Sequence, residues 1–144
     1  MTIAVARNDS AEGRAALLHA AREAEFQHAP LVVLHVLDHD LPDSDEHQEA
    51  LSREIQQTLT EGGYGSVDWT LAVAPDEEGR AVALINLTEQ LGADLLVIGS
   101  RRRTPIGKFL LGSTVQRVVL DSPVPVLVVK APHPEVAGRQ PGHL

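Results

Sequence analysis

Short apolar runs alternate along the chain with segments in which apolar residues recur every three or four positions. The runs occupy Ile3–Ala6, Leu31–Leu37, 67–73, 95–98 and 124–129. Near-continuous apolar runs of this length are typical of parallel strands that are buried on both faces. Polar and apolar residues alternate only in 67–73, which predicts an edge strand with one wetter face.

The four segments between these runs have the spacing of amphipathic helices. The apolar stripes expected to be buried are Leu17, Ala21 and Ala24; Leu51, Ile55 and Leu59; Leu84, Leu87 and Leu91; and Val115, Val118 and Val119. Helix starts are indicated where a capping residue is followed three positions later by Glu or Gln. These pairs are Asp9 with Glu12, Asp43 with Glu46, and Ser113 with Gln116.

This alternation of strands and helices predicts one α/β domain over residues 1–130. The expected architecture is a doubly wound five-stranded parallel sheet in the order 3-2-1-4-5, with helices on both faces. Residues 131–144 are rich in proline and glycine, which predicts an irregular or disordered tail. In such a sheet ligands bind beyond the carboxyl ends of the strands where the winding reverses, here between the first and fourth strands.

Composition excludes several classes of function. The chain has 144 residues and no cysteine, which excludes disulfide scaffolds and thiolate metal sites. A net charge of −8 and an aromatic content of 3% argue against nucleic-acid binding. No apolar run approaches the roughly 18 residues that a membrane helix needs. The start of the chain lacks the pattern of a secretory signal, so we expect a soluble cytoplasmic protein without membrane contact.

The charge is distributed unevenly, because residues 99–130 hold six basic side chains and a single acidic one. Within this segment Arg101 and Arg102 follow a predicted strand, and Gly112, Ser113 and Thr114 precede a predicted helix. Backbone N–H groups at a helix start attract anions, and arginines add charge and forked donors. The segment is not a P-loop, since that pattern would place Arg102 at its first glycine and Phe109 at its hydroxyl position.

The same segment resembles the universal stress protein family, whose nucleotide-binding members carry the pattern G-x-x-G, nine residues, then G-[ST]. Gly99 matches the first glycine, Gly112 and Ser113 match the final pair, and the spacing agrees. The closing phrase VPVLVVK, from Val124 to Lys130, is similar to the family's last strand. The resemblance covers roughly residues 2–130. It implies adenine-nucleotide binding in stress response or signalling, and a homodimer formed through Val124 to Lys130.

By position, the resemblance implies that Val36 faces the base and Asn8 the base or sugar. Gly99, Gly112, Ser113 and Thr114 would face the ribose and phosphates, and Arg7, Arg101 and Arg102 complete the expected set. The implied ligand is ATP or AMP, with Mg²⁺ as a possible companion. Two positions depart from the family pattern: Arg102 replaces the second glycine, and Asn8 stands where the family usually has an acid.

Other functions stay open on the sequence alone. The fold can serve as a dimeric interaction module that binds no nucleotide, with the arginine segment contacting an unknown protein partner. Weak ATP hydrolysis is a further alternative, although no general base or nucleophile is placed and efficient catalysis is not expected. A phosphorylation receiver is less favoured, because the chain lacks the last helix of that class. The acidic segment 38–47 is read as a solvated loop, and His35 as a satisfied core histidine.

Overall fold

In a computed structural model the chain folds into four helices around a parallel sheet; the structure describes residues 1–38, 43–101 and 111–131. The elements are β1 (Ile3–Ala6), α1 (Ala11–Gln27), β2 (Leu31–Leu37), α2 (Asp45–Glu61), β3 (Trp69–Pro75), α3 (Arg80–Gln90), β4 (Leu95–Ser100), α4 (Ser113–Asp121) and β5 (Val126–Lys130). The strand order is β3-β2-β1-β4-β5, and every paired strand is parallel. The predicted fold class and strand order are confirmed.

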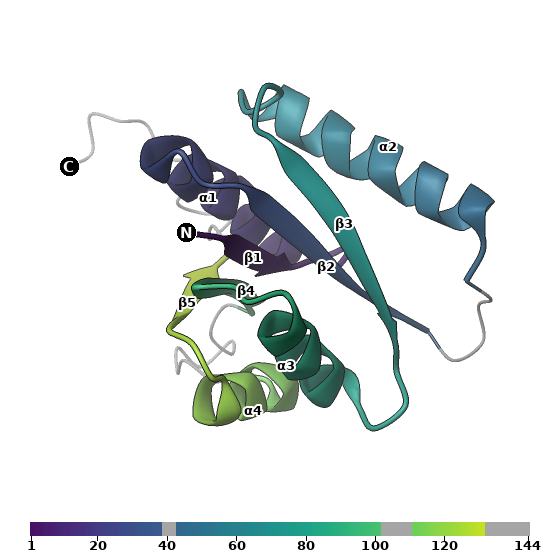
Figure 1. Ribbon diagram of the computed structural model, residues 1–144, viewed down its shortest axis with the longest axis vertical. Helices are drawn as coiled ribbons and strands as arrows, with labels where there is room; N and C mark the ends of the chain where they lie inside the picture. Colours follow the sequence, from purple (N-terminus) through teal and green to yellow (C-terminus); the bar gives the residue numbers. More distant parts are fainter. Residues whose placement is uncertain (39–42, 102–110, 132–144) are drawn as a thin grey trace.

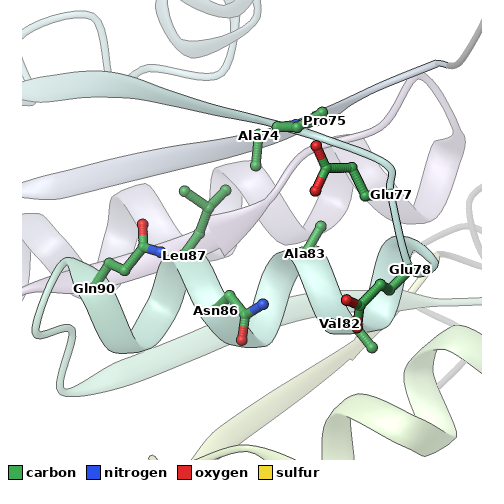
Figure 2. A pocket seen from close by; sticks show the side chains of 9 residues that line it. All are labelled: Ala74, Pro75, Glu77, Glu78, Val82, Ala83, Asn86, Leu87 and Gln90. Carbon is green, nitrogen blue, oxygen red and sulfur yellow. The ribbon is translucent and has the colours of Figure 1, made fainter.

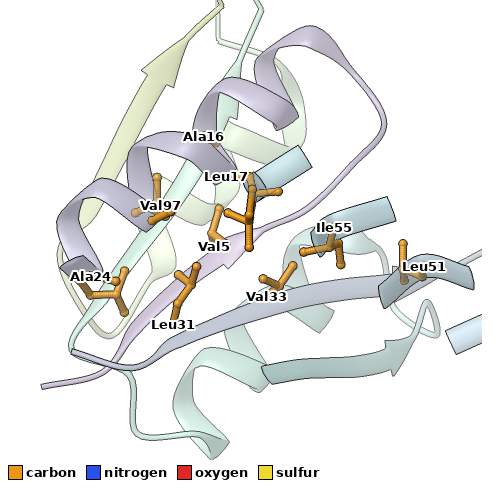
Figure 3. Close-up of a cluster of buried hydrophobic side chains, with 13 residues drawn as sticks. Val5, Ala16, Leu17, Ala24, Leu31, Val33, Leu51, Ile55 and Val97 are labelled. Carbon is orange, nitrogen blue, oxygen red and sulfur yellow. The ribbon is translucent and has the colours of Figure 1, made fainter. Parts of the chain in front are cut away.

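Two layers of helices cover the two faces of the sheet (Figure 1). Successive side chains of a strand point to opposite faces, so each strand contributes to both cores. Ile3 and Val5 of β1 pack in the cluster formed with α1 and α2; Figure 3 shows Val5 beside Leu17, and Val33 of β2 beside Ile55. Ala4 and Ala6 pack instead in the cluster formed with α3 and α4.

The N-termini of the helices differ from the predicted capping boxes. Ser10, not Asp9, caps α1, because its hydroxyl accepts the N–H of Gly13 at 2.9 Å. Ser44, not Asp43, caps α2 and accepts the N–H of His47 at 3.1 Å. The cap of α4 is Gly112, which makes no side-chain hydrogen bond. Ser10 and Ser44 have the extended φ and ψ of an N-cap residue, which places their hydroxyls over the first turns of the helices.

Two predicted stripe residues lie at the surface. Leu91 is 39% exposed at the end of α3, and Val119 is 42% exposed on α4. Helix α4 buries only Val115 and Val118, so its apolar stripe is narrower than expected. The edge position of β3 is confirmed, although it begins at Trp69 instead of residue 67, and β5 begins at Val126 instead of residue 124.

Within the described ranges no helix is long and apolar enough to cross a bilayer. The cytoplasmic location expected from the sequence stays a prediction. The predicted irregular tail lies outside the described residues, apart from Ala131, which is buried.

Candidate functional site

A cleft of about 390 Å³ opens at the carboxyl edge of the sheet, between the ends of β1 and β4. This is the point where the winding direction reverses, as expected from the strand order. Its lining comes from four parts of the fold: Ala6, Asn8 and Glu12; Arg80 and Leu84; Ile98, Gly99 and Arg101; and Gly112, Ser113, Thr114 and Val115. Six of the nine predicted site residues therefore meet in one cleft.

Glycine suits the two motif positions in this cleft for different physical reasons. A Cβ on Gly99 would lie 2.2 Å from the carbonyl oxygen of Glu12, so β4 can pass under α1 only without a side chain there. A Cβ on Gly112 would meet nothing within 4 Å among the described residues. Gly99 is required by the packing of the protein itself. Gly112 leaves open space beside the start of α4, which is the space a ligand can fill.

The N-terminus of α4 offers unsatisfied backbone donors to the cleft. The first intrahelical bond of this helix runs from Gln116 N–H to the carbonyl of Gly112 at 2.9 Å. The N–H groups of the first turn have no partner within a helix, and Gly112 supplies no side-chain cap. Together with the hydroxyls of Ser113 and Thr114, these groups make the end of α4 suited to an anion.

Asn8 is held in one orientation by its neighbour. Its Oδ1 accepts the backbone N–H of Ser10 at 3.2 Å and also the Ser10 hydroxyl. Because a backbone N–H only donates, the oxygen must face Ser10, and the amide NH₂ faces the other way. These two hydrogen bonds occupy the amide oxygen. Asn8 can present a donor to a ligand.

Among the described residues, three charged side chains line the cleft: Arg101 after β4, Arg80 at the start of α3, and Glu12 in the first turn of α1. Arg80 and Glu12 are not in the predicted site, because neither belongs to the motif or to the basic segment. Only the topology brings them there, since parallel crossover helices all begin at the carboxyl edge of the sheet. Two cations against one carboxylate give the cleft a net positive lining.

Two of the predicted residues that the structure describes do not join this set. Arg7 donates from Nη2 to Glu54 Oε2 of α2 at 3.0 Å, so its guanidinium lies on the α2 side of the sheet. Val36 is 4% exposed and packs within the core shared with α3 and α4, without lining the cleft. Arg102, at the departure from the motif, lies outside the described residues.

His35 of β2 lies beside His47 of α2, with ring centroids 5.9 Å apart. Its Nδ1 is enclosed and has no hydrogen-bond partner among the described residues, so the expectation of a satisfied core histidine is wrong. Burial, and then the charges of Arg7 and His47, lower its pKa from 6.5 to about 4. The ring is neutral at pH 7 and is not part of the cleft.

A second hollow of about 180 Å³ lies between the end of β3 and α3 (Figure 2). Its charged side chains, Glu77 and Glu78, are both acidic. This hollow is therefore opposite in charge to the cleft at β1 and β4 and does not suit an anion. In the part of the chain that the structure describes, no group of three or more acidic, histidine or cysteine side chains is placed to hold a metal ion.

Comparison with known proteins identifies the class. The family model described as "Universal stress protein family" matches residues 1–130. A universal stress protein of Mycolicibacterium smegmatis is 35% identical over 123 residues, which cover 84% of this chain and 90% of that protein. The chain belongs to the universal stress protein family.

Two solved structures share the fold and were determined with ligands. A universal stress protein from Archaeoglobus fulgidus in complex with dAMP aligns with a TM-score of 0.66 and 21% identity, covering 90% of this chain and 98% of that one. A universal stress protein in complex with cAMP aligns with a TM-score of 0.66 and 24% identity, covering 92% and 98%. These alignments establish that the chain has the fold of both proteins.

Proposed function

We propose that this protein binds an adenine nucleotide, ATP or AMP, in the cleft between β1 and β4, and that occupancy biases a stress-response or signalling state. The observation that carries the proposal is the convergence of Gly112, Ser113, Thr114 and Arg101 on one cleft at the switch point of the sheet. Uncapped helix N–H groups, hydroxyls and a guanidinium are the donors that a phosphate requires.

The family relationship supports the adenine part of the proposal. The two relatives solved with dAMP and cAMP share this fold, and both ligands carry an adenine base and one phosphate. The walls of the cleft also suit such a ligand. Ala6, Leu84 and Ile98 provide apolar surface for a base, whereas the charged groups lie around them.

Magnesium is proposed only as a companion of a triphosphate. Among the described residues, Glu12 is the single carboxylate that lines the cleft, and Ser113 and Thr114 add hydroxyl oxygens. Mg²⁺ is usually held by one or two carboxylates together with substrate phosphates, so these oxygens fit an ion that arrives with ATP.

Calorimetric titration of nucleotide-stripped protein with ATP and AMP, each with and without Mg²⁺, tests the proposal. We expect a dissociation constant in the micromolar range and a weaker one for Ser113→Ala. Ser66→Ala, which removes an exposed hydroxyl between α2 and β3, is the matched control and should bind as the wild type does. No heat and no thermal shift at millimolar nucleotide would contradict nucleotide binding and favour the interaction module without a nucleotide.

We also propose a homodimer that pairs the strand between Val124 and Lys130 with its copy. Strand β5 is an edge of the sheet, and Val126 to Val129 are only partly buried. Helix α4, which leads into this strand, leaves Leu120 75% exposed. An apolar edge of this kind is normally covered by pairing.

Sedimentation at micromolar concentration should show a dimer. Leu120→Lys should weaken it, whereas Phe26→Lys, at a residue of α1 that is 80% exposed, should not. A monomeric wild type would contradict the dimer and leave the nucleotide proposal standing.

A further inference from the structure

Two arginines in the described part of the chain are partly buried, and only one of them forms an ion pair. Arg7 is ion-paired with Glu54 at 3.0 Å. Arg80 has no ion pair and no hydrogen bond to any described residue, although its side chain is only partly exposed. Arginine stays charged at every accessible pH, so it cannot relieve partial burial by losing its proton. An anion bound beside this guanidinium would compensate its partly buried charge.

The position of Arg80 indicates where that anion would lie. Arg80 is the first residue of α3 and lines the same cleft as Arg101 and the start of α4. Helices α3 and α4 pack against each other, so the guanidinium and the first turn of α4 belong to adjoining walls. The backbone reaches this point through Gly79 at φ 104°, a conformation that favours glycine.

Glu12 makes one side of the cleft negatively charged, opposite the arginines. Its carboxylate has no hydrogen bond or ion pair to a described residue, and it comes from α1, on the side away from α3. A phosphate is repelled by this carboxylate and attracted by the two arginines. The sugar hydroxyls, which donate hydrogen bonds, are instead suited to Glu12.

We propose that Arg80 is the specificity-determining residue that makes the cleft select a phosphorylated nucleoside over the free nucleoside. The inference rests on the proposed nucleotide function and names the group that reads the phosphate. The planar guanidinium fork donates two parallel hydrogen bonds to phosphate oxygens, which an uncharged ligand does not accept in this way. Arg80 positions the ligand and takes part in no bond-breaking step.

The test is the ratio of the affinities for AMP and adenosine, measured by calorimetry on the wild type and on Arg80→Gln. We expect the wild type to prefer AMP. Arg80→Gln should lower that preference by about tenfold to a hundredfold, the range for a hydrogen bond to a charged group, with adenosine affinity unchanged within about twofold. Arg80→Lys, which keeps the charge without the fork, should recover part of the preference.

Arg22→Gln removes an exposed arginine from α1 and is the matched control, with an unchanged ratio. Thermal unfolding verifies that Arg80→Gln is folded, and we expect it to be at least as stable as the wild type because a partly buried unpaired charge is removed. If Arg80→Gln keeps the full preference for AMP, the role of Arg80 is refuted and the nucleotide site stands. If the wild type binds neither ligand nor ATP, the nucleotide function fails and this inference fails with it.

Discussion

Replacing the two motif glycines by alanine should separate the packing of the fold from the binding of its ligand. At position 99 the added Cβ would lie 2.2 Å from the carbonyl oxygen and 2.5 Å from the carbonyl carbon of Glu12. Both are backbone atoms of the first turn of α1, so relief requires a shift of helix against strand. Overpacking in a well-packed interior costs about 1–3 kcal/mol, and a clash with backbone belongs at the upper end.

Gly112→Ala should behave in the opposite way. The new Cβ meets nothing within 4 Å in the described structure, and a φ of −64° suits any residue. Alanine is a poorer N-cap than glycine, so we expect a loss of stability of about 0.5 kcal/mol. The methyl group occupies the cleft, however, and nucleotide affinity should fall.

Urea unfolding with linear extrapolation measures both stabilities, and calorimetry with AMP measures both affinities. The reasoning predicts that Gly99→Ala loses about 3 kcal/mol and that Gly112→Ala loses mainly binding. A Gly99→Ala variant as stable as the wild type would refute the packing role of Gly99. A Gly112→Ala variant with full affinity would show that the ligand does not approach the start of α4.

Three further outcomes follow from the contacts. Ser10→Ala should cost about 1 kcal/mol of unfolding free energy in urea, because it removes the α1 cap, and equal stability would contradict that role. Because the folded pKa of His35 lies below its value of 6.5 in the unfolded chain, the unfolded state binds the proton more readily. The free energy of unfolding should therefore fall as the pH drops from about 6.5 toward 4. The full shift corresponds to at most about 3 kcal/mol. Because solvent screens this partly exposed ring, we expect a loss nearer about 1 kcal/mol. His35→Leu should flatten that dependence in urea titrations, and an unchanged pH profile would exclude His35 as its source. Glu54→Gln should cost at most about 1 kcal/mol, since its carboxylate is largely exposed beside Arg7, and double-mutant unfolding with Arg7→Gln would reveal any larger coupling.

The sequence predicts the sheet well because its information is local. Each buried strand is a continuous apolar run, and the alternation of strands with helical stripes leaves few possible topologies. The caps were harder to predict. Asp9 has a good capping side chain, but the path of the backbone places the Ser10 hydroxyl, and not the Asp9 carboxylate, at the cap over Gly13.

The candidate site also combines residues that the local sequence indicates with residues that only the fold brings together. Gly99, Gly112 and Ser113 belong to the family motif, so the resemblance implies them, whereas Arg80 reaches the cleft only through the topology of the sheet. Strand periodicity explains why Arg7 does not line the cleft. Ala6 lines the cleft, and the side chain of the next residue, Arg7, points to the opposite face of the sheet, where it forms an ion pair with Glu54.

The most direct test of the central claim is a map of backbone amide shifts in the nitrogen-15-labelled protein during titration with AMP. The account predicts that the largest saturable shifts fall on Asn8, Arg80 and Gly99, and on the first turn of α4 from Gly112 to Val115. Shifts that saturate elsewhere, for example around the acidic hollow at Glu77 and Asn86, would contradict the assignment of the cleft. No shifts at millimolar AMP or ATP would contradict nucleotide binding itself.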